Sequence, residues 1–277
     1  MFGSGTLGII AGAGELPRRI IAECKASKRS CFVVAFEGIT DASTTEGVLH
    51  TRLHIAKIGK AIRALREAGA GEIVMAGRVG RPHPSTLRPD FTGLKLLTLF
   101  RKLSTQGDDA VFSTIIRFLE TKGFKVVGVD HVLADLVIRE GAFGKHAPDK
   151  RAQNDIHIGM RAAREIGKLD IGQAVIVQGG VILGVEGAEG TDRLVSRCAE
   201  LQNEGPGGVL VKMKKPGQDA RVDLPSIGLY TVENAYAAGL RGIAVEAGGA
   251  LVINRDLVRK KADELGLFIV GITPDAL

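Results

Sequence analysis

The sequence predicts an α/β protein of two domains, an N-terminal Rossmann-like domain with a parallel sheet and a C-terminal α/β domain with a mixed sheet. Its 277 residues exceed what one ordinary core needs. In the first half, nearly all-apolar strand candidates alternate with helical segments, which is the pattern of a parallel sheet covered on both faces. In the second half, a Gly-Gly turn joins two strand candidates, which indicates a hairpin.

The first half carries the alternation, and we assign residues 1–138 to the N-terminal domain. A short apolar strand at Leu7–Ala11 ends in a glycine-rich turn, and Pro17 suits the first turn of the helix that follows. We expect further strands at Cys31–Phe36, Glu72–Ala76 and Lys125–Val129, and helices at Ala56–Ala68, Leu94–Leu103 and Ala110–Lys122.

The second domain is expected at residues 152–277, after a linker at 139–151 that mixes glycines, a proline and charges of both signs without an apolar period. We expect its strands at Ala174–Val177, Val181–Val185, Gly208–Met213, Gly242–Val245, Ala250–Ile253 and Phe268–Ile272. We expect its helices at Asp155–Ile166, Thr191–Gln202, Thr231–Ala238 and Arg255–Leu265.

Composition limits the classes of partner. Aromatic residues make up 4% of the chain and Trp is absent, so stacking on the bases of a single-stranded nucleic acid is poorly supported. The net charge of +6 favours an anionic partner, but the charges are dispersed, so an acidic small molecule or an anionic membrane surface suits them equally. We expect no nucleic-acid partner, because only the overall charge favours one.

Cysteine usage and hydropathy indicate a cytoplasmic protein. Cys24, Cys31 and Cys198 stand far apart without a C-x-x-C pair, which argues against a disulfide scaffold and fits a reducing compartment. No apolar run reaches the roughly 18 residues of a membrane span. The helix expected at Leu94–Leu103 combines apolar bulk with Lys95, Arg101 and Lys102. It suits a core helix with a basic rim, and it leaves open a grip on an acyl chain or a membrane surface.

Several catalytic motifs are absent from the sequence. There is no G-x-S-x-G elbow and no G-x-x-x-x-G-K-[ST] loop, which excludes the usual serine hydrolases and P-loop NTPases. His50 and His54 are four residues apart but lack the H-E-x-x-H spacing, and the six histidines form no metal constellation.

The loop Gly12-Ala13-Gly14-Glu15-Leu16-Pro17 follows a strand candidate and opens a helix, as a dinucleotide fingerprint does. Glu37 even lies where a ribose-binding acid would be expected. However, Pro17 replaces the third glycine, and Glu15 places a negative charge where a pyrophosphate would rest. NAD binding is therefore disfavoured, while a nucleotide or sugar contact stays open beside the alternative of a plain tight turn.

Two further loops of the first domain are candidate ligand contacts. Gly77-Arg78-Val79-Gly80-Arg81 places arginines on a glycine-rich turn, and guanidinium groups suit phosphate because they are planar, bidentate donors. Solvated arginines on a surface turn would look the same. Gln106-Gly107-Asp108-Asp109 precedes a helix, where Asp108 or Asp109 would be its N-cap. Capping explains one aspartate, and the second leaves a ligand or metal contact open.

The segment 186–228 is unusually rich in charge and glycine. Carboxylates can hold a hard divalent cation, and basic side chains can hold phosphate oxygens. Glu189-Gly190-Thr191-Asp192-Arg193 leads into a helix, which gives Thr191 a capping role and directs backbone N–H groups toward an anion.

Further along this segment, Lys214-Lys215-Pro216-Gly217-Gln218-Asp219 leads to Arg221 and Asp223. If this stretch is extended, alternation places Asp219, Arg221 and Asp223 on one side. Two carboxylates beside one guanidinium fit a Mg²⁺ ion and phosphates in one cleft, because Mg²⁺ takes only one or two carboxylates. A surface salt-bridge cluster is the alternative.

These motifs resemble a known family over essentially the whole chain. LGIIAGAGELP, MAGRVGRP and QGDDA in the first domain, with LDIGQAVIVQGGVILGVEGAEGTDRL and LVKMKKPGQDARVDLPSIGLYTV in the second, are similar to the LpxI-type UDP-2,3-diacylglucosamine pyrophosphatases of bacterial lipid A synthesis. The second-domain motifs are long and specific, whereas the N-terminal glycine turn alone is a weak signal.

The resemblance implies a Mg²⁺-dependent hydrolase that splits UDP-2,3-diacylglucosamine into UMP and 2,3-diacylglucosamine 1-phosphate (lipid X), with the ligand in the cleft between the domains. Asp223 would hold the metal with help from Asp219 or Asp192, while Lys214 and Arg221 would act in catalysis by offsetting phosphate charge. The expected substrate-binding residues are Gly12, Gly14, Glu15, Leu16, Gly77, Arg78, Gln106, Gly107, Asp108, Asp109, Glu189, Gly190, Thr191, Asp192, Arg193 and Gln218.

Two other readings of the sequence stay open. A non-catalytic carrier of a lipid or nucleotide sugar would use the same cleft without hydrolysis, and a nicotinamide-dependent oxidoreductase is a weaker alternative. The expected partner is the glycolipid nucleotide substrate, and peripheral contact with the inner membrane and a homodimer are also left open.

Overall fold

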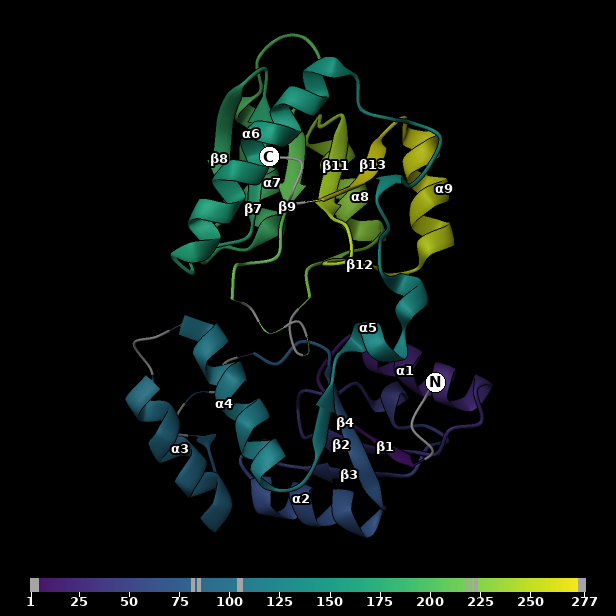
Figure 1. Ribbon diagram of the computed structural model, residues 1–277, viewed down its shortest axis with the longest axis vertical. Helices are drawn as coiled ribbons and strands as arrows, with labels where there is room; N and C mark the ends of the chain where they lie inside the picture. Colours follow the sequence, from purple (N-terminus) through teal and green to yellow (C-terminus); the bar gives the residue numbers. More distant parts are fainter. Residues whose placement is uncertain are drawn as a thin grey trace. The chain divides into compact units, whose positions relative to one another are not determined.

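The computed structural model of the chain describes residues 5–80, 83, 86–103, 107–217, 219, 221 and 224–273, and for residues 99–103 and 107–110 it describes the backbone only. The chain forms two compact units (Figure 1). Unit 1 comprises the described residues up to Ala134 together with Asp219 and Arg221. Unit 2 comprises the described residues from Asp135 to Gly217 and from Leu224 onward.

Unit 1 is built around a parallel sheet with the strand order β3-β2-β1-β4-β5. Its strands are β1 (Thr6–Ala11), β2 (Cys31–Phe36), β3 (His50–Leu53), β4 (Ala70–Ala76) and β5 (Lys125–Val127). Its helices are α1 (Leu16–Ala26), α2 (Ile58–Glu67), α3 (Phe91–Leu103), α4 (Gly107–Thr121) and α5 (Val129–Val132), with a 3-10 turn η1 (Ala42–Thr44). Residues Ala134–Leu136 form a further 3-10 turn, η3. The prediction of a Rossmann-like parallel sheet is confirmed.

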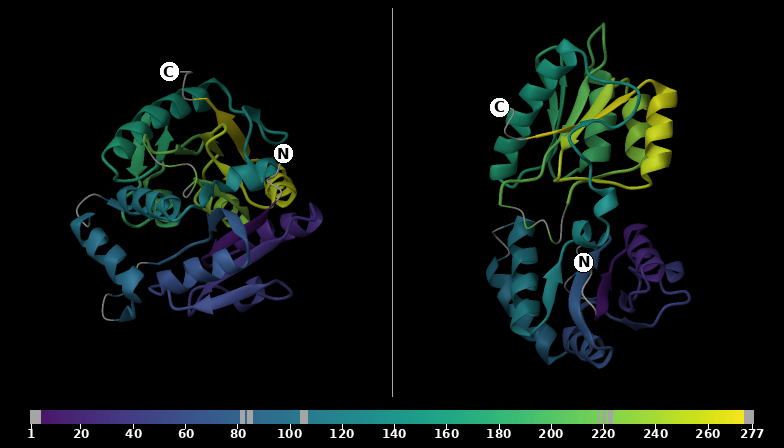
Figure 2. Two further views of the ribbon diagram at one scale, coloured as in Figure 1. Left: turned by 60° about the horizontal axis from the view of Figure 1, so that its bottom comes forward. Right: turned by 45° about the vertical axis from the view of Figure 1, so that its right-hand side comes forward.

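Helices cover both faces of this sheet. On one face, α2 and α4 pack their apolar sides on the sheet, where Leu65 and Ile116 are buried with Ile73 of β4. On the other face lies α1, which buries Ile20 and Ile21 (Figure 2). Because both faces are covered, the central strands are apolar on both sides, and this is why the sequence reads as short all-apolar runs.

The sequence did not predict β3 or α5. β3 has the sequence His-Thr-Arg-Leu, and none of its four residues is fully buried. It lies at the edge of the sheet, where one neighbouring strand suffices and a polar sequence is tolerated. At the other edge, β5 ends at Val127 rather than at Val129, because the chain turns into α5.

Unit 2 contains a mixed sheet with the order β6-β13-β11-β9-β7-β8, which confirms the second domain's predicted class. The strands are β6 (Gly141–Ala142), β7 (Ala174–Gln178), β8 (Val181–Val185), β9 (Val209–Lys212), β11 (Gly242–Glu246) and β13 (Phe268–Ile272), and β10 (Ser226–Ile227) pairs with β12 (Leu251–Val252) in a separate ribbon. The helices are α6 (Lys150–Lys168), α7 (Thr191–Cys198), α8 (Leu229–Ala237) and α9 (Arg255–Leu265), with a 3-10 turn η4 (Ala199–Leu201).

Two separate apolar clusters hold unit 2 together. On one face of the sheet, α6 buries Ile156 and Met160 against β7 and β9. On the other face, α7, α8 and α9 pack on the alternate side chains of the same strands, with Leu194 and Val258 fully buried. The expected linker 139–151 is part of this unit, since it contributes β6 and the first residues of α6, and Asp149 caps α6 through a 2.8 Å bond from the Ala152 N–H.

The predicted hairpin joins β7 and β8 through Gly179 and Gly180. Both glycines have positive φ angles, of 57° and 85°, which suit a two-residue hairpin turn. The buried carboxylate of Asp155 on α6 accepts both of their N–H groups, at 3.1 and 2.7 Å. The buried Asp155 carboxylate thus stabilises the hairpin turn, because it accepts hydrogen bonds from two backbone N–H groups that would otherwise lack a partner.

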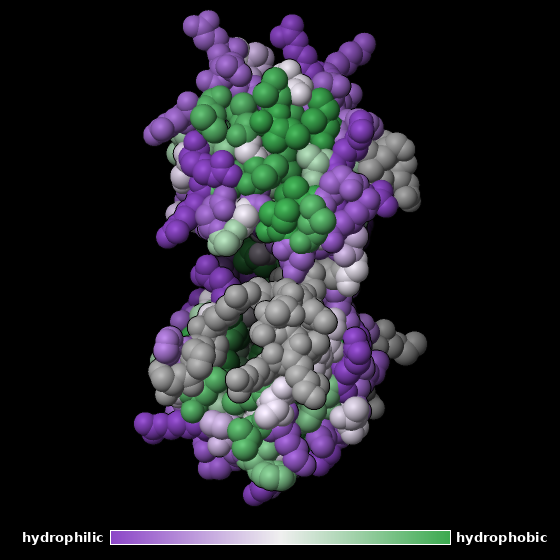
Figure 3. Space-filling view, turned by 90° about the vertical axis from the view of Figure 1, so that its left-hand side faces the viewer, coloured by the Kyte–Doolittle hydropathy of each residue, from purple (hydrophilic) through white to green (hydrophobic). Residues whose placement is uncertain are grey.

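Apolar side chains gather on one face of unit 2 (Figure 3). On β8, which forms one edge of the sheet, Val181 is 56% exposed and Ile182 is 43% exposed. Val185 at the end of the strand is also exposed. In the described part of the chain, no helix has the length and apolar character needed to cross a membrane.

Candidate functional site

Two predicted loops of unit 1 lie against each other at the carboxyl ends of β1 and β4. The N–H of Gly12 donates to the Ala76 carbonyl at 2.8 Å, and Ala13 and Arg78 exchange backbone hydrogen bonds of 2.8 and 2.9 Å. In the order β3-β2-β1-β4-β5, β1 and β4 flank the point where the strand order reverses. Ligands of open α/β sheets bind at this point.

Glycine is required at positions 12 and 77 because the two backbones approach so closely. A Cβ atom on Gly12 would lie 2.6 Å from the Arg78 carbonyl oxygen. One on Gly77 would lie 2.7 Å from the Ala13 oxygen, and the φ angle of Gly77 is +92°. The glycines therefore have a structural role in joining the loops, in addition to any contact with a ligand.

The first loop does not offer its amides as a dinucleotide fingerprint would. The N–H of Gly14 donates to the carboxylate of Asp41 at 3.0 Å, so an internal anion takes the position of a phosphate. Glu15 is the N-cap residue of α1 without a side-chain cap, and its carboxylate pairs with Arg19 at 3.0 Å. Leu16 begins the helix. The Gly14 N–H is therefore engaged within the chain, and the disfavoured binding of NAD stays a prediction.

The third predicted loop of unit 1 lies at the start of α4. The helix begins at Gly107, so Asp108 and Asp109 are in its first turn, and the expectation that one of them is the N-cap is wrong. Acidic residues in a first turn are favoured by the helix dipole, which explains why the sequence pattern resembles a cap. Gln106 lies outside the described residues, as do the side chains at 107–110.

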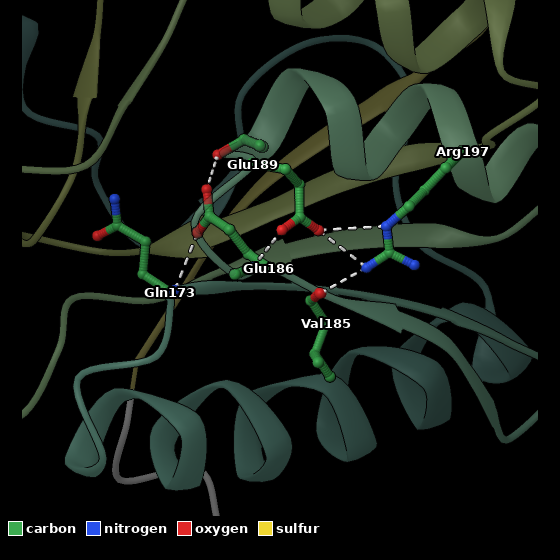
Figure 4. Close-up of polar contacts among 7 residues, drawn as sticks. Gln173, Val185, Glu186, Glu189 and Arg197 are labelled. Carbon is green, nitrogen blue, oxygen red and sulfur yellow. Dashed lines mark hydrogen bonds and ion pairs between the residues drawn. The ribbon is translucent and has the colours of Figure 1, made fainter.

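In unit 2, the loop that contains Glu186 and Glu189 is held by its own carboxylates (Figure 4). Glu186 is 6% exposed, and its oxygens accept the Gln173 N–H at 2.9 Å and the Thr191 hydroxyl at 2.7 Å. Glu189 accepts the Gly187 N–H at 3.1 Å and pairs with Arg197 at 3.0 Å. These contacts join the loop to Gln173 and to α7 without any ligand present, and one of them binds the loop's own backbone at Gly187.

The predicted capping role of Thr191 is wrong. Gly190 is the N-cap of α7 and Thr191 is its first residue. The Thr191 hydroxyl donates to the Glu186 carboxylate, and a residue inside the helix is not placed to accept the N–H groups that an N-cap side chain binds. Asp192 and Arg193 are exposed in the first turn of the helix.

Glu189 keeps its charge more readily than an ordinary glutamate. Its own backbone N–H and, after it, the Arg197 guanidinium lower the pKa of the Glu189 carboxyl. A carboxylate at the entry to α7 is therefore ionised well below neutral pH.

Lys214 lies at the carboxyl edge of the same sheet. Its backbone N–H donates to the Glu246 carboxylate at the end of β11, at 3.0 Å. The preceding residue, Met213, donates its N–H to the Gln173 carbonyl at 2.9 Å, and the Gln173 N–H is held by Glu186. The structure thus brings the 186–193 loop and Lys214 together through Gln173.

A second lysine, Lys212, lies at the same edge of unit 2 as Lys214. Lys212, the last residue of β9, is 8% exposed, and its ammonium donates to the Ser226 carbonyl at 3.3 Å. β8, β9 and β11 all end here, since β8 is antiparallel to β7 and β7 is antiparallel to β9. Lys215 is turned to Asp170, with an ion pair of 2.6 Å.

Asp219 and Arg221 meet, but not through the extended geometry that the sequence predicted. Both lie outside the strands, and Arg221 is in a turn. The Asp219 carboxylate accepts the Arg221 backbone N–H at 3.0 Å and two guanidinium bonds at 2.9 and 2.7 Å, so it folds the chain back locally. Arg221 also pairs with Glu120 of α4 at 2.7 Å. The hydrogen bonds to Asp219, and after them the bond to Glu120, raise the pKa of the Arg221 guanidinium above its ordinary value.

The predicted metal ligands are carboxylates near Arg221. Among the described residues, no three His, Cys, Asp or Glu side chains gather as metal ligands, and both oxygens of Asp219 accept bonds from Arg221. Mg²⁺ needs only one or two protein carboxylates, and the main predicted ligand, Asp223, lies outside the described residues, as does Gln218.

The fold and these loops define a class of α/β protein whose candidate ligand-binding groups gather at the carboxyl edges of its sheets. Family models place the chain more narrowly, since residues 6–136 match the LpxI N-terminal domain and residues 139–270 match the LpxI C-terminal domain. The chain is 39% identical over 274 residues to UDP-2,3-diacylglucosamine pyrophosphatase LpxI of Caulobacter vibrioides, covering 97% of this chain and 98% of that protein. The chain belongs to the LpxI family.

Some contacts at these edges were not expected from the sequence. Asp41 and Glu246 each bind a backbone N–H of a predicted site loop, yet they are 27 and 32 residues away from it in the chain. Gln173 links two site segments through its backbone, which no side-chain pattern reveals. Their only sequence signal is a position close to the end of a strand candidate.

Proposed function

We propose that the protein hydrolyses the pyrophosphate bond of UDP-2,3-diacylglucosamine in lipid A biosynthesis, releasing UMP and 2,3-diacylglucosamine 1-phosphate. The observation that carries this proposal is the similarity to the Caulobacter vibrioides pyrophosphatase over nearly the full length of both chains. The geometry supports it, because glycine-rich loops and lysines gather at the carboxyl edges of parallel strands, where phosphate ligands of α/β proteins bind.

The reaction adds water across one P–O–P bond. The water oxygen bonds to one phosphorus, the bridging oxygen leaves with the electron pair on the other phosphate, and the water protons pass to solvent or to the products. Lys214, together with Arg193 and Arg221, would offset the negative charge that grows on the phosphates as this bond breaks. The loop of Glu186 is held by hydrogen bonds to Gln173 and Thr191, so it would cost little to order on binding.

We also propose that Mg²⁺ is required and that Asp223 is its main protein ligand, as the family resemblance implies. A bound Mg²⁺ would polarise the phosphates and lower the pKa of a water molecule. Chelation by EDTA should abolish UMP release, and added Mg²⁺ should restore it. Full turnover in EDTA would overturn this part of the proposal alone.

The experiment that tests the function follows UMP formation from UDP-2,3-diacylglucosamine by the purified protein. We expect many UMP molecules per protein molecule, with equal amounts of the diacylglucosamine phosphate. A non-catalytic carrier would bind the substrate and release it unchanged. Stoichiometric binding without turnover, in the presence of Mg²⁺, would therefore favour the carrier over the hydrolase.

A cytoplasmic protein that touches the inner membrane remains a proposal, and α3 is its best support. Phe91 is 74% exposed and Leu94 is 53% exposed, and the Lys95 ammonium lies over the Phe91 ring at 4.5 Å. Exposed apolar groups beside a cation suit the surface of an anionic bilayer. Phe91→Ser with Leu94→Ser should reduce sedimentation with phosphatidylglycerol vesicles, and unchanged sedimentation would contradict this contact.

A homodimer is likewise a proposal, and the apolar edge strand β8 is the place to test it. Its sequence, Val-Ile-Leu-Gly-Val, has no charge or proline, which are the usual devices that keep an edge strand from pairing. A second copy supplies the same edge for antiparallel pairing about a two-fold axis. Ile182→Lys should lower the mass measured by light scattering from dimer to monomer, and a monomeric wild-type protein would overturn the proposal.

A further inference from the structure

Unit 1 contains a second candidate site, away from the paired glycine loops. A surface pocket of about 610 Å³ lies at the carboxyl ends of β2 and β3, next to the start of α2. Its polar lining comes from Glu37, His54, Lys57, Lys60 and Arg88, with Thr86 at its side. Its volume lies within the range of about 300–1,000 Å³ that is usual for small-molecule sites, and the carboxyl edge is where such sheets bind ligands.

The cations of this pocket are available to a ligand. Within the described part of the chain, the side chains of Lys57, Lys60 and Arg88 take part in no ion pair or hydrogen bond. His54 accepts the Ala56 N–H on Nδ1 at 3.3 Å, so in the neutral ring Nε2 carries the proton and can donate. Three permanent positive charges and one donor thus face a single carboxylate, Glu37.

The other carboxylate near the pocket is already used. Asp90 accepts the Lys60 backbone N–H on Oδ2 at 3.1 Å and the Gly93 N–H on Oδ1 at 2.8 Å. It therefore serves the first turns of α2 and α3 and does not neutralise the lysine side chains. The excess of positive charge calls for an anion from outside the protein.

The remaining lining tells which anion fits. Inorganic phosphate alone would gain nothing from Glu37, whose charge repels it. A ligand that carries hydroxyl groups as well as phosphate would bind both the basic side chains and Glu37, because a carboxylate at the end of the second strand can accept hydrogen bonds from a ribose. Leu53, which is half-buried in the lining, supplies apolar contact for a flat base.

We infer that this pocket binds a phosphorylated ribonucleoside, with its phosphate against Lys57, Lys60 and Arg88 and its ribose hydroxyls against Glu37. The chemical class follows from the pocket alone. The choice of UMP as the particular nucleotide rests on the proposed function, in which UMP is a product and part of the substrate.

The test is equilibrium binding of UMP to the full-length protein by calorimetry, with inorganic phosphate, uridine and 2′-deoxy-UMP as comparison probes. We expect UMP to bind more tightly than phosphate or uridine. The double variant Lys57→Met with Lys60→Met should weaken UMP binding by about tenfold or more, since it removes two charge-assisted bonds and keeps the apolar stems. Glu37→Gln should weaken UMP binding more than 2′-deoxy-UMP binding.

Lys28→Met is the matched control, because Lys28 is an exposed lysine of unit 1 that does not line the pocket. It removes one charge and should leave the affinity for UMP unchanged. Circular dichroism of every variant shows whether the fold is kept. Unchanged UMP affinity in the folded double variant would overturn the inference, as would phosphate binding as tightly as UMP.

The two proposals can fail separately. If the protein hydrolyses UDP-2,3-diacylglucosamine while the pocket variants keep their UMP affinity and KM, the pocket inference fails and the proposed function stands. If no hydrolysis occurs but the pocket variants lose nucleotide affinity, the proposed function fails and the pocket stands.

Discussion

Cys24 and Cys31 show how residues that are separate in the sequence become a chemical pair. Cys24 lies near the end of α1 and Cys31 opens β2. A hydrogen bond from the Cys24 thiol lowers the pKa of Cys31 to about 7, although burial opposes this shift. The same interaction raises the pKa of Cys24. The spacing of seven residues gave no sign of this contact, because only the turn between α1 and β2 returns the chain to it.

The first prediction concerns the reactivity of Cys31. A lowered pKa means that the thiolate forms at lower pH, so the rate of alkylation by iodoacetamide should rise through pH 7 and then level off. An ordinary thiol would rise through about pH 8.5. Mass spectrometry of the Cys31 peptide measures the rate. Cys24→Ala, which removes the donor, should move the midpoint upward, and Cys24→Ser should keep it low; equal midpoints in all three proteins would contradict the pairing.

The second prediction concerns Gly12. Gly12→Ala places a methyl group 2.6 Å from the Arg78 carbonyl and should destabilise the protein by about 1–3 kcal/mol, the usual cost of overpacking. Urea unfolding measures the change. Gly71→Ala is the control, since a Cβ there meets no atom within 4 Å. A loss at Gly71 as large as at Gly12 would show that close approach is not the cause.

At the scale of elements, capping decides where several helices begin. Asp90 stands directly before α3, where its side chain binds the Gly93 N–H, and its second oxygen binds the Lys60 N–H in the first turn of α2. One carboxylate therefore serves two helices. In unit 2, by contrast, Gly190 begins α7 and the nearby Thr191 hydroxyl is bound to Glu186.

The third prediction is that Asp90→Ala lowers the free energy of unfolding by about 1–2 kcal/mol, in the range of a lost N-cap. Asp90→Asn should recover about half of this, because one amide oxygen can replace one of the two carboxylate oxygens. Urea unfolding of the three proteins gives the values. If Asp90→Asn is as unstable as Asp90→Ala, capping of α3 by the side-chain oxygen is not what stabilises this region.

Most elements could be predicted from the sequence because their signals are local. β2, β8, α9 and β13 match their predicted ranges. β2 and β13 are mostly buried apolar runs and α9 has a helical period, whereas the Gly179-Gly180 turn marks the start of β8. β3, β6 and β10 were missed because they are short and gain their strand geometry from a neighbouring strand. The predicted extended geometry around Arg221 failed for the same kind of reason, since a local carboxylate contact replaced a strand partner.

At the scale of the whole molecule, the proposed hydrolysis can be tested at the residues that would hold the metal and the phosphates. The fourth prediction is that Asp223→Ala and, separately, Lys214→Met reduce kcat for UMP release by about 10²-fold or more, which is typical for the loss of one group that stabilises the transition state. Asp256→Ala is the control, because Asp256 is 91% exposed on α9 and pairs only with Arg259 among the described residues. Near-normal turnover of Asp223→Ala would remove Asp223 from its central place.

The sequence by itself determined the α/β class, most of the elements and the family, because burial patterns, turn residues and long motifs each involve residues that are close together in the chain. Only the tertiary structure decided which carboxylates are already engaged: Asp41 on Gly14, Glu246 on Lys214, and Asp219 on Arg221. It also gathered Glu37 with Lys57, Lys60 and Arg88 around one pocket. The physical reason is that hydrogen bonds and cavities depend on distances between strand ends, and strand order, which sets those distances, is not contained in any local pattern.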